Sequence, residues 1–202
     1  MKKVLLITLV ALLGIATANA QIKVGAKAGV NLSTLSDMDD AKFKLGFHVG
    51  GFAEFAISDR IAIQPELLYS TQGTSFSESL TEEGITATAD VNFNLSYINL
   101  PVLLKVKLAE GLNIEVGPQV GFLLSAKTKT EVNVLGISAS KTEDVKSICN
   151  SLDVAAAAGL SYTFAEKFVV GARYTLGLTK LNKNGDASVK NGVIQVSFGY
   201  KF

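Results

Sequence analysis

The sequence predicts an all-β protein, an eight-stranded antiparallel up-and-down transmembrane β-barrel preceded by a cleavable signal peptide. Three observations support this prediction. Eight segments alternate apolar with small or polar residues at a period of two, which places one set on each face of a β-strand. The connectors between them are long and short in turn, as in barrels with long loops on one side of a membrane. After the N-terminal segment, no apolar run approaches the ~20 residues that a membrane-spanning helix needs.

The N-terminus indicates export from the cytoplasm. Two lysines precede an almost unbroken apolar run over residues 4–16, and Ala18 and Ala20 supply small residues at the cleavage-recognition positions. We therefore predict a signal peptide over residues 1–20 and a barrel domain over residues 21–202. An uncleaved membrane helix is the alternative, but the run is short for a span. Removal of the two lysines changes the formal net charge from +1 to −1, which argues against nucleic acid as a partner.

The predicted strands share one construction, an apolar row that alternates with a row of small or polar residues. In the last strand, Val196, Phe198 and Tyr200 alternate with Ser197 and Gly199. This alternation is typical of a strand with an apolar environment on one face and a polar environment on the other. The eight segments cover residues 22–32, 43–55, 61–72, 91–108, 114–124, 154–164, 168–178 and 193–202.

The fourth segment is irregular. Its apolar row occupies odd positions up to Tyr97 and even positions from Ile98 onward. A β-bulge that adds one residue to this strand would absorb the change of phase, and Pro101 lies close by, where a ladder donor is missing. We therefore predict a bulge at Tyr97 and Ile98, with Tyr97 on the apolar face.

The connectors predict how the barrel is oriented. Three are tight turns, at residues 58–60, 109–111 and 165–167, whereas polar segments at residues 33–42, 73–90, 127–152 and 181–191 are long. The third long segment contains a possible hairpin over residues 132–139 and a possible helical turn within residues 143–151. Outer-membrane barrels have short periplasmic turns and long external loops. This pattern and the even strand number predict a cell outer membrane protein with both termini in the periplasm.

The composition of the two faces decides which of them points inward. A soluble lipocalin-like barrel would bury the apolar face around a ligand and expose the polar face. A water-facing surface is normally dense in Lys and Glu, but here the polar face is rich in Gly, Ser and Asn. We therefore expect the apolar face to contact lipid. The tyrosines on that face, several near strand ends, suit membrane interfaces; they are Tyr69, Tyr97, Tyr162, Tyr174 and Tyr200.

Several segments resemble a known family. The chain ends on Phe202, and a terminal aromatic on an alternating strand resembles the assembly signal of outer-membrane barrels. Together with that end, five segments are similar to the PorT-type outer-membrane β-barrel family of Bacteroidetes; they are GAKAGVNLS at residues 25–33, PELLYS at 65–70, YINLPVLLK at 97–105, GPQVGFLLSAK at 117–127 and GARYTLGL at 171–178. The resemblance implies fold and location more firmly than activity. It also implies, weakly, an accessory role in protein secretion.

Charged residues on the polar face predict a plugged lumen. An eight-stranded barrel is just wide enough for side chains to fill, and charges away from bulk water must be paired. We predict a structural charge network formed by Lys27, Glu54, Glu66, Lys105, Glu115 and Arg173. Glu66 with Arg173 or with Lys105 is the first pairing expected. A narrow ion-conducting path is the alternative.

No constellation in the sequence predicts catalysis. His48 is the single histidine, and nucleophilic chemistry needs a base beside the nucleophile, so we expect His48 to bond a lumenal carboxylate. We predict no catalytic residue, no cofactor and no metal ligand. An outer-membrane lipid-modifying enzyme remains the rival class. Acidic residues in the first two long segments are compatible with divalent cations at lipopolysaccharide, although solvated charge is the simpler interpretation; they are Asp37, Asp39, Asp40, Glu78, Glu82, Glu83 and Asp90.

The expected partners follow from the membrane location. They are outer-membrane lipid and lipopolysaccharide along the wall, and the barrel assembly machinery during insertion. We expect a porin-like monomer with a structural or surface-interaction role. The sequence identifies no surface or periplasmic protein partner. The lone Cys149 excludes an intrachain disulfide.

Overall fold

The computed structural model describes residues 22–36, 42–82, 85–134, 137–183 and 189–202. The predicted signal peptide and the acidic residues at positions 37–40 and 83 lie outside these ranges. Within the described residues, no helix is long and apolar enough to cross a bilayer. The elements there are β1 (Ile22–Leu35), β2 (Lys42–Ala56), β3 (Ile61–Glu82), β4 (Ile85–Lys107), β5 (Leu112–Val134), β6 (Ile137–Asp144), the 3-10 helix η2 (Lys146–Ile148), β7 (Leu152–Phe164), β8 (Phe168–Gly177) and β9 (Asn191–Lys201).

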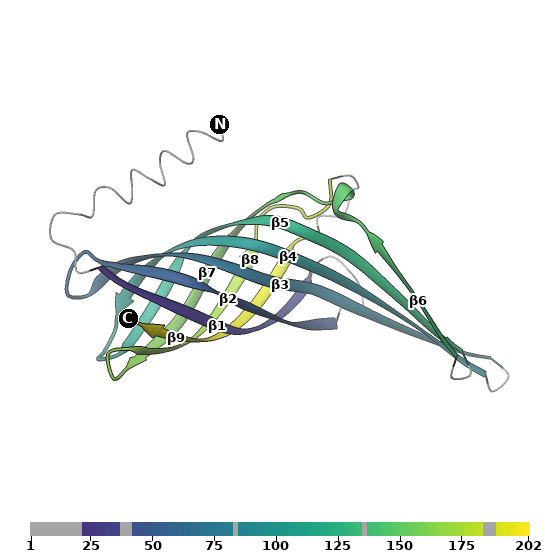
Figure 1. The fold of residues 1–202 in the computed structure, drawn as a ribbon, viewed down its shortest axis with the longest axis horizontal. Coiled ribbons are helices and arrows are strands. Elements are labelled where there is room, and N and C mark those ends of the chain that lie inside the picture. Colours follow the sequence, from purple (N-terminus) through teal and green to yellow (C-terminus); the bar gives the residue numbers. More distant parts are fainter. Residues whose placement is uncertain (1–21, 37–41, 83–84, 135–136, 184–188) are drawn as a thin grey trace.

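Eight of these strands close into a ring (Figure 1), in the order β1, β2, β3, β4, β5, β7, β8 and β9, and each neighbouring pair is antiparallel. The ring closes between β9 and β1, where Val196 lies opposite Val30. Ile22 pairs with Phe55, beside the tight turn before β3, so β1 begins and β9 ends at the short-turn end. The predicted up-and-down antiparallel barrel is confirmed.

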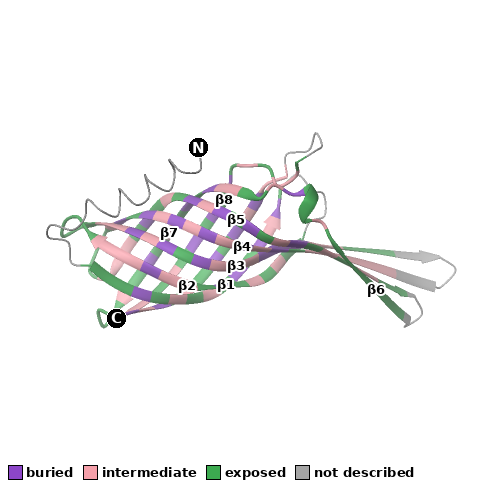
Figure 2. Cartoon of the chain, turned by 45° about the horizontal axis from the view of Figure 1, so that its top comes forward, coloured by how far each residue is buried: buried purple, intermediate pink, exposed green. Residues whose placement is uncertain are grey.

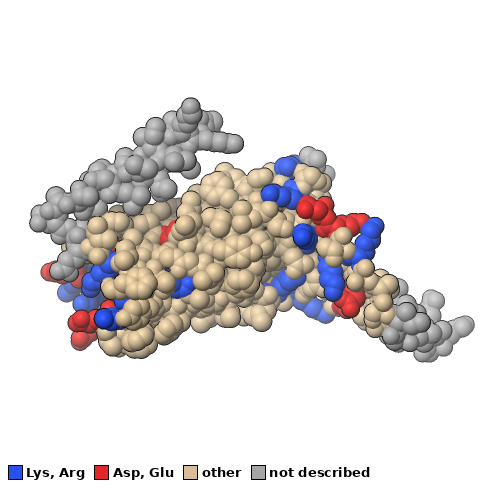
Figure 3. Space-filling model, viewed as in Figure 1, with Lys and Arg blue, Asp and Glu red and all other residues tan. Residues whose placement is uncertain are grey.

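The apolar rows of the barrel strands lie on the outside. Buried and exposed residues alternate along each barrel strand (Figure 2). Val196 is 54% exposed and Leu160 is 51% exposed, although both are large apolar residues in the middle of strands. Charged side chains gather toward the two ends of the molecule, and the broad middle is mostly uncharged (Figure 3). This is the surface that lipid, and not water, would cover.

Three barrel strands, β3, β4 and β5, continue beyond the barrel, where the sequence predicted polar loops, and β6 joins them there. β2 begins at Lys42, opposite Ser75 of β3. Beyond that point β3 and β4 remain paired with each other as far as Glu82 and Ile85. β5 pairs with β6 from Lys127 to Val134. We call this four-stranded extension the blade (Figures 1 and 2); it comprises residues 75–82, 85–94, 127–134 and 137–144.

The blade corrects two predictions about the loops. Residues 73–82 and 85–90 are not a polar loop, because they pair with each other in a long hairpin. The hairpin suspected at residues 132–139 does form, between β5 and β6. η2 lies within the segment where a helical turn was expected. The acidic residues Glu78 and Asp90 lie on opposite faces of the sheet, because Glu78 pairs with Ala89 and Asp90 with Ser77.

The predicted bulge exists at the expected level, but the extra residue belongs to the neighbouring strand. Ser96 pairs with Ser125 and Tyr97 pairs with Leu123, so Leu124 of β5 is the inserted residue. β4 therefore keeps its phase through Tyr97. The placement of Tyr97 on the lipid face was wrong, because Tyr97 is 1% exposed and points into the barrel. A one-residue insertion moves the later side chains of the strand that contains it to the other face, so this insertion changes the phase of β5 and not that of β4.

Glycine on the lumenal face lets neighbouring groups approach closely. A Cβ at Gly29 would meet the carbonyl oxygen of Val196 and lie 2.6 Å from Cε1 of His48. The His48 ring therefore occupies the space that a side chain at residue 29 would take. At Gly51, by contrast, the nearest atom is a carbonyl oxygen at 3.4 Å.

We expect Gly29→Ala to lower the free energy of unfolding by about 1–3 kcal/mol, because the added methyl group overpacks a site bounded by backbone. Urea titration of the refolded protein in detergent micelles measures this loss. Gly51→Ala is the matched control and should change the midpoint little. Equal midpoints for the two variants would contradict the close approach at Gly29.

Candidate functional site

The lumen holds a continuous network of charged side chains near the short-turn end. Seven of the eight barrel strands contribute one residue each, and β7 contributes small residues instead. All seven residues are joined through ion pairs between strands far apart in the sequence. The members, in order of contact, are Lys27, Glu66, Arg173, Glu115, Lys105, Glu54 and Lys201.

Glu66 is the most heavily bonded carboxylate of the network. Arg173 donates to both of its oxygens, from Nη1 to Oε2 at 2.9 Å and from Nη2 to Oε1 at 2.8 Å. Lys27 Nζ donates to the same carboxylate at 3.1 Å, and Gln64 Nε2 donates at 2.7 Å. The Glu66 side chain is fully shielded from solvent. A bidentate guanidinium pair of this kind fixes both partners in orientation.

The rest of the network leads from Arg173 toward the short-turn end. Arg173 Nη2 also donates to Glu115 Oε2 at 2.9 Å. Lys105 lies 3.7 Å from Glu115 Oε1 and donates to Glu54 Oε2 at 2.8 Å. Lys201 Nζ donates to both oxygens of Glu54, at 3.1 and 3.0 Å. Each carboxylate is thus shared by at least two cations, which suits charges removed from bulk water.

The structure brings the six residues of the predicted network together. Of the two pairings considered for Glu66, the one with Arg173 is present, whereas Lys105 contacts Glu54 and Glu115. The prediction missed Lys201, although its position on the polar row of the last strand was a sufficient signal. Two further charged side chains have local partners: Lys44 donates to Asn94 Oδ1, and Asp153 accepts from Thr179.

A neutral polar layer lies next to the charge network. Asn31, on β1, donates to Ser70 Oγ at 3.0 Å and to two backbone carbonyls on β2 and β3. Gln195 Nε2 donates to Asn31 Oδ1 at 3.3 Å. His48 is 1% exposed, and its Nδ1 lies 2.7 Å from the same oxygen. The expected carboxylate partner of His48 is therefore an amide. An amide orients an imidazole but does not act as a general base.

An apolar cluster closes the lumen toward the blade. Its buried members are Leu35, Leu95, Tyr97, Leu123, Ala126 and Cys149, and Val145, Leu181 and Val189 pack against them. Cys149 comes from the loop after η2 and is 7% exposed. Burial raises the pKa of its thiol, which favours the protonated, unreactive form. The cysteine therefore packs as a small apolar side chain.

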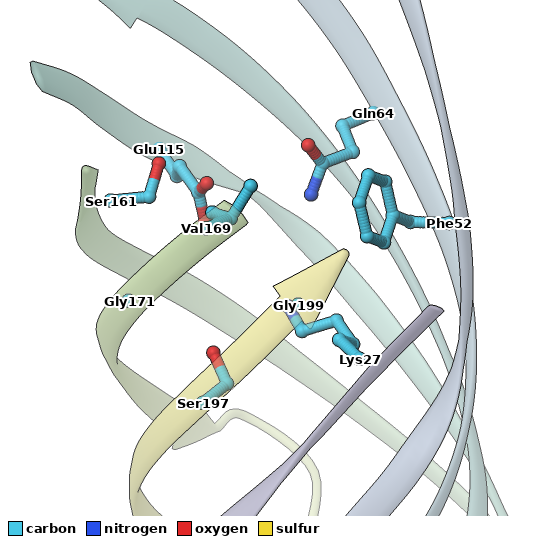
Figure 4. A pocket seen from close by; sticks show the side chains of 9 residues that line it. All are labelled: Lys27, Phe52, Gln64, Glu115, Ser161, Val169, Gly171, Ser197 and Gly199. Atoms are coloured by element: carbon cyan, nitrogen blue, oxygen red, sulfur yellow. The ribbon is translucent and has the colours of Figure 1, made fainter. Parts of the chain in front are cut away.

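The space that remains inside the charge layer is small. Figure 4 shows a cavity beside Lys27 and Glu115, with Gln64 and Ser161 pointing toward it. Its volume is about 20 Å³, which is close to the space one water molecule requires. Side chains thus fill the barrel at this level.

The polarity of the sheet inverts where it leaves the barrel. Phe93 and Val91 are in phase with the buried Tyr97, so they lie on the face that continues the lumen. Phe76 packs against Phe93 with ring centroids 6.2 Å apart, and Val132 on the same face is 39% exposed. The opposite face is polar on all four strands; it carries Ser75, Ser77, Ser79, Thr88, Asp90, Asn92, Lys129, Glu131, Asn133, Ser138, Ser140 and Thr142.

The surface of the blade therefore differs from that of the barrel wall. Its outer face suits water, whereas its inner face combines the partly exposed Phe76, Val91, Phe93 and Val132 with the threonines Thr128 and Thr130. The edge strands of that inner face carry charge, including the exposed pair of Lys141 and Glu143 at 2.6 Å. Apolar surface rimmed by polar groups is typical of an interaction site.

Residues suited to hold a metal ion do not cluster in the part of the chain that the structure describes. Of the acidic residues that the sequence suggested for cations, Glu78 and Asp90 lie on different faces of the blade, and Asp37, Asp39, Asp40 and Glu83 fall outside the described ranges.

Comparison with known proteins gives one family and several similar folds. Residues 17–183 match the family described as "Outer membrane protein beta-barrel domain". No curated protein sequence matches the chain. Among solved structures, the attachment invasion locus protein Ail of Yersinia pestis, in complex with the heparin analogue sucrose octasulfate, is 17% identical, with 90% of this chain and 99% of that chain covered and a TM-score of 0.47.

Two further structures have similar folds. Neisserial surface protein A is 16% identical, with 91% of this chain and 99% of that chain covered and a TM-score of 0.49. The N-terminal β-barrel domain of OprF from Pseudomonas aeruginosa is 14% identical, with 91% and 100% covered and a TM-score of 0.41.

Proposed function

Because this chain belongs to the family of outer membrane protein beta-barrel domains, we propose that it is a plugged outer-membrane barrel that acts through surface interaction, not through catalysis or transport. Both termini would then lie in the periplasm, since β1 begins and β9 ends at the short-turn end. The blade would project from the cell. The exposed apolar rows would contact lipid and lipopolysaccharide, and the protein would be a monomer.

The plug has support from three successive layers across the lumen. The charge network, the neutral layer around Asn31 and the apolar cluster around Tyr97 each draw side chains from several strands. A hydrated ion that crossed the lumen would have to break ion pairs in the first layer and enter the apolar side chains of the last layer. Both steps are costly for a charge away from water.

We expect no discrete conductance steps when the refolded protein is reconstituted into planar bilayers. The cavity in the charge layer has space for little more than one water molecule, and the last layer is apolar, so ions have no hydrated path. A porin reconstituted in the same way serves as the positive control. Regular single-channel openings from the wild-type chain would contradict the plugged lumen and favour the narrow ion-conducting path.

The blade is the observation that carries the surface-interaction proposal. Extra strands and an inverted polarity pattern are unnecessary for a barrel that only spans a membrane. The inner face combines Phe76, Val91 and Val132 with charges on the edge strands, which suits a protein surface of mixed character. We propose that this face contacts a protein outside the cell.

A photo-crosslinking amino acid in place of Ala139 tests in intact cells whether the inner face of the blade contacts a protein. Ala139 and Ser140 are both exposed neighbours on β6, and they lie on the inner and outer face respectively. We expect protein adducts from position 139 and few from position 140. Adducts from neither position, in cells where the barrel is folded, would contradict the proposed role.

Two finer assignments complete the proposal. The segments similar to PorT-type barrels support membership in that Bacteroidetes branch, and an accessory role in secretion is then the second candidate. An adduct with a secretion component at position 139 would favour it.

Phe202 is 75% exposed and extends an aromatic group that includes Phe168 and Tyr200, which supports its proposed role as the signal for the assembly machinery.

A further inference from the structure

A wide vestibule opens into the barrel at the short-turn end. Its volume is about 1230 Å³, and it is lined by the strand ends that meet at this end of the barrel and by the three tight turns. Four lysines on the strands face it, accompanied by one strand carboxylate, Glu54; the lysines are Lys23, Lys105, Lys107 and Lys201.

The innermost cations of the vestibule outnumber their acidic partners. Lys105 and Lys201 are 3% and 6% exposed, and both donate to the single carboxylate of Glu54. The other carboxylate near Lys105 is Glu115, at 3.7 Å, and it accepts a shorter bond from Arg173. Two nearly buried ammonium groups thus share one full countercharge.

The remaining acidic groups of the lining lie on the turns and not on the strands. Asp59 lies between β2 and β3, Glu110 between β4 and β5, and Glu166 between β7 and β8, while Arg60 adds a cation to the first turn. The lining as a whole is nearly balanced, with five basic and four acidic residues. The exposed part of the lining is balanced, because Lys23, Arg60 and Lys107 face three acids on the turns. The excess positive charge therefore lies at the inner end, where the buried Lys105 and Lys201 have Glu54 as the one acidic residue beside them in the lining. Low-dielectric walls strengthen the field of such a recessed charge.

We infer that this vestibule binds a compact anion with at least two negative charges, of the phosphate or carboxylate type. Lys105 and Lys201 would meet it at the inner end, and Lys23 and Lys107 would flank it. Ammonium groups act as point charges with three donors each, so they accept either oxyanion. Access from the periplasm rests on the proposed function, whereas binding itself depends only on the lining.

The test uses the mature chain refolded in a zwitterionic detergent at constant ionic strength. Isothermal titration with pyrophosphate, and separately with tricarballylate, reports binding and its stoichiometry. We expect one saturable site for at least one of the two anions, and the anion that binds identifies the phosphate or carboxylate source. Absence of saturable binding by both anions would overturn the inference.

Matched variants separate a site from general attraction. Lys23→Gln with Lys107→Gln removes two exposed cations of the vestibule and should weaken binding about tenfold or more. Lys129→Gln with Lys141→Gln removes the same charge from the blade and should leave affinity within about twofold. Equal weakening by both pairs would overturn the site. The titration needs no surface partner, so failure of the crosslinking experiment would leave its result intact.

Discussion

Glu66→Gln is expected to lower the free energy of unfolding by about 3–5 kcal/mol, because it leaves two cations buried without their main countercharge. Arg173 loses one of its two carboxylate partners, and Lys27 loses both of its bonds. The amide of Gln can accept hydrogen bonds but supplies no charge. Urea titration in micelles measures the loss, and the shift of folded barrel on unheated gels gives a second readout.

Two controls identify the cause of that loss. Adding Lys27→Met to Glu66→Gln removes the orphaned ammonium group while Arg173 keeps Glu115, so this double variant should recover part of the stability. Glu143→Gln breaks the exposed pair with Lys141 on the blade and should have no measurable effect. A Glu66→Gln protein as stable as the wild type would show that the network does not stabilise the barrel.

Alternation was enough to predict the barrel strands, because each of them has lipid-like surroundings on one side. It failed for the blade. Residues 73–90 continue to alternate, but their outer row is Ser, Thr and Asp instead of Val and Leu, so the segment has the composition of a loop. The pairing of β3 with β4, and of β4 with β5 forty residues away, makes it a sheet. Local pattern does not report such long-range pairing.

The site shows the same limit in another form. Period-two counting placed Glu66 and Arg173 on the same face, but it did not establish which charges touch. Contact depends on the stagger of a closed barrel, which brings together residues 107 positions apart. Tyr97 was misplaced for a related reason. The odd positions of β4 face inward throughout, and its apolar row changes position because the lumen is apolar at the level of Tyr97 and polar toward the short-turn end.

Val196→Arg should cost about 2–4 kcal/mol of unfolding free energy in a bilayer. Val196 lies in the middle of β9, between Val30 and Ala172 on the neighbouring strands, and is 54% exposed. If lipid covers this row, the arginine must either remain in hydrocarbon or extend toward a distant interface. Chemical denaturation of protein folded into vesicles measures the difference.

Ser140→Arg gives the matched comparison, since Ser140 is exposed on the polar outer face of the blade and should tolerate the charge. The pair distinguishes the membrane barrel from a soluble barrel. In water, an arginine at an exposed position changes stability little and raises solubility, so both variants would then behave alike. In hydrocarbon, arginine should lower stability at residue 196 but not at residue 140. The loss should also decrease as arginine is moved along β9 toward Phe202, and only a hydrocarbon surrounding produces this combination.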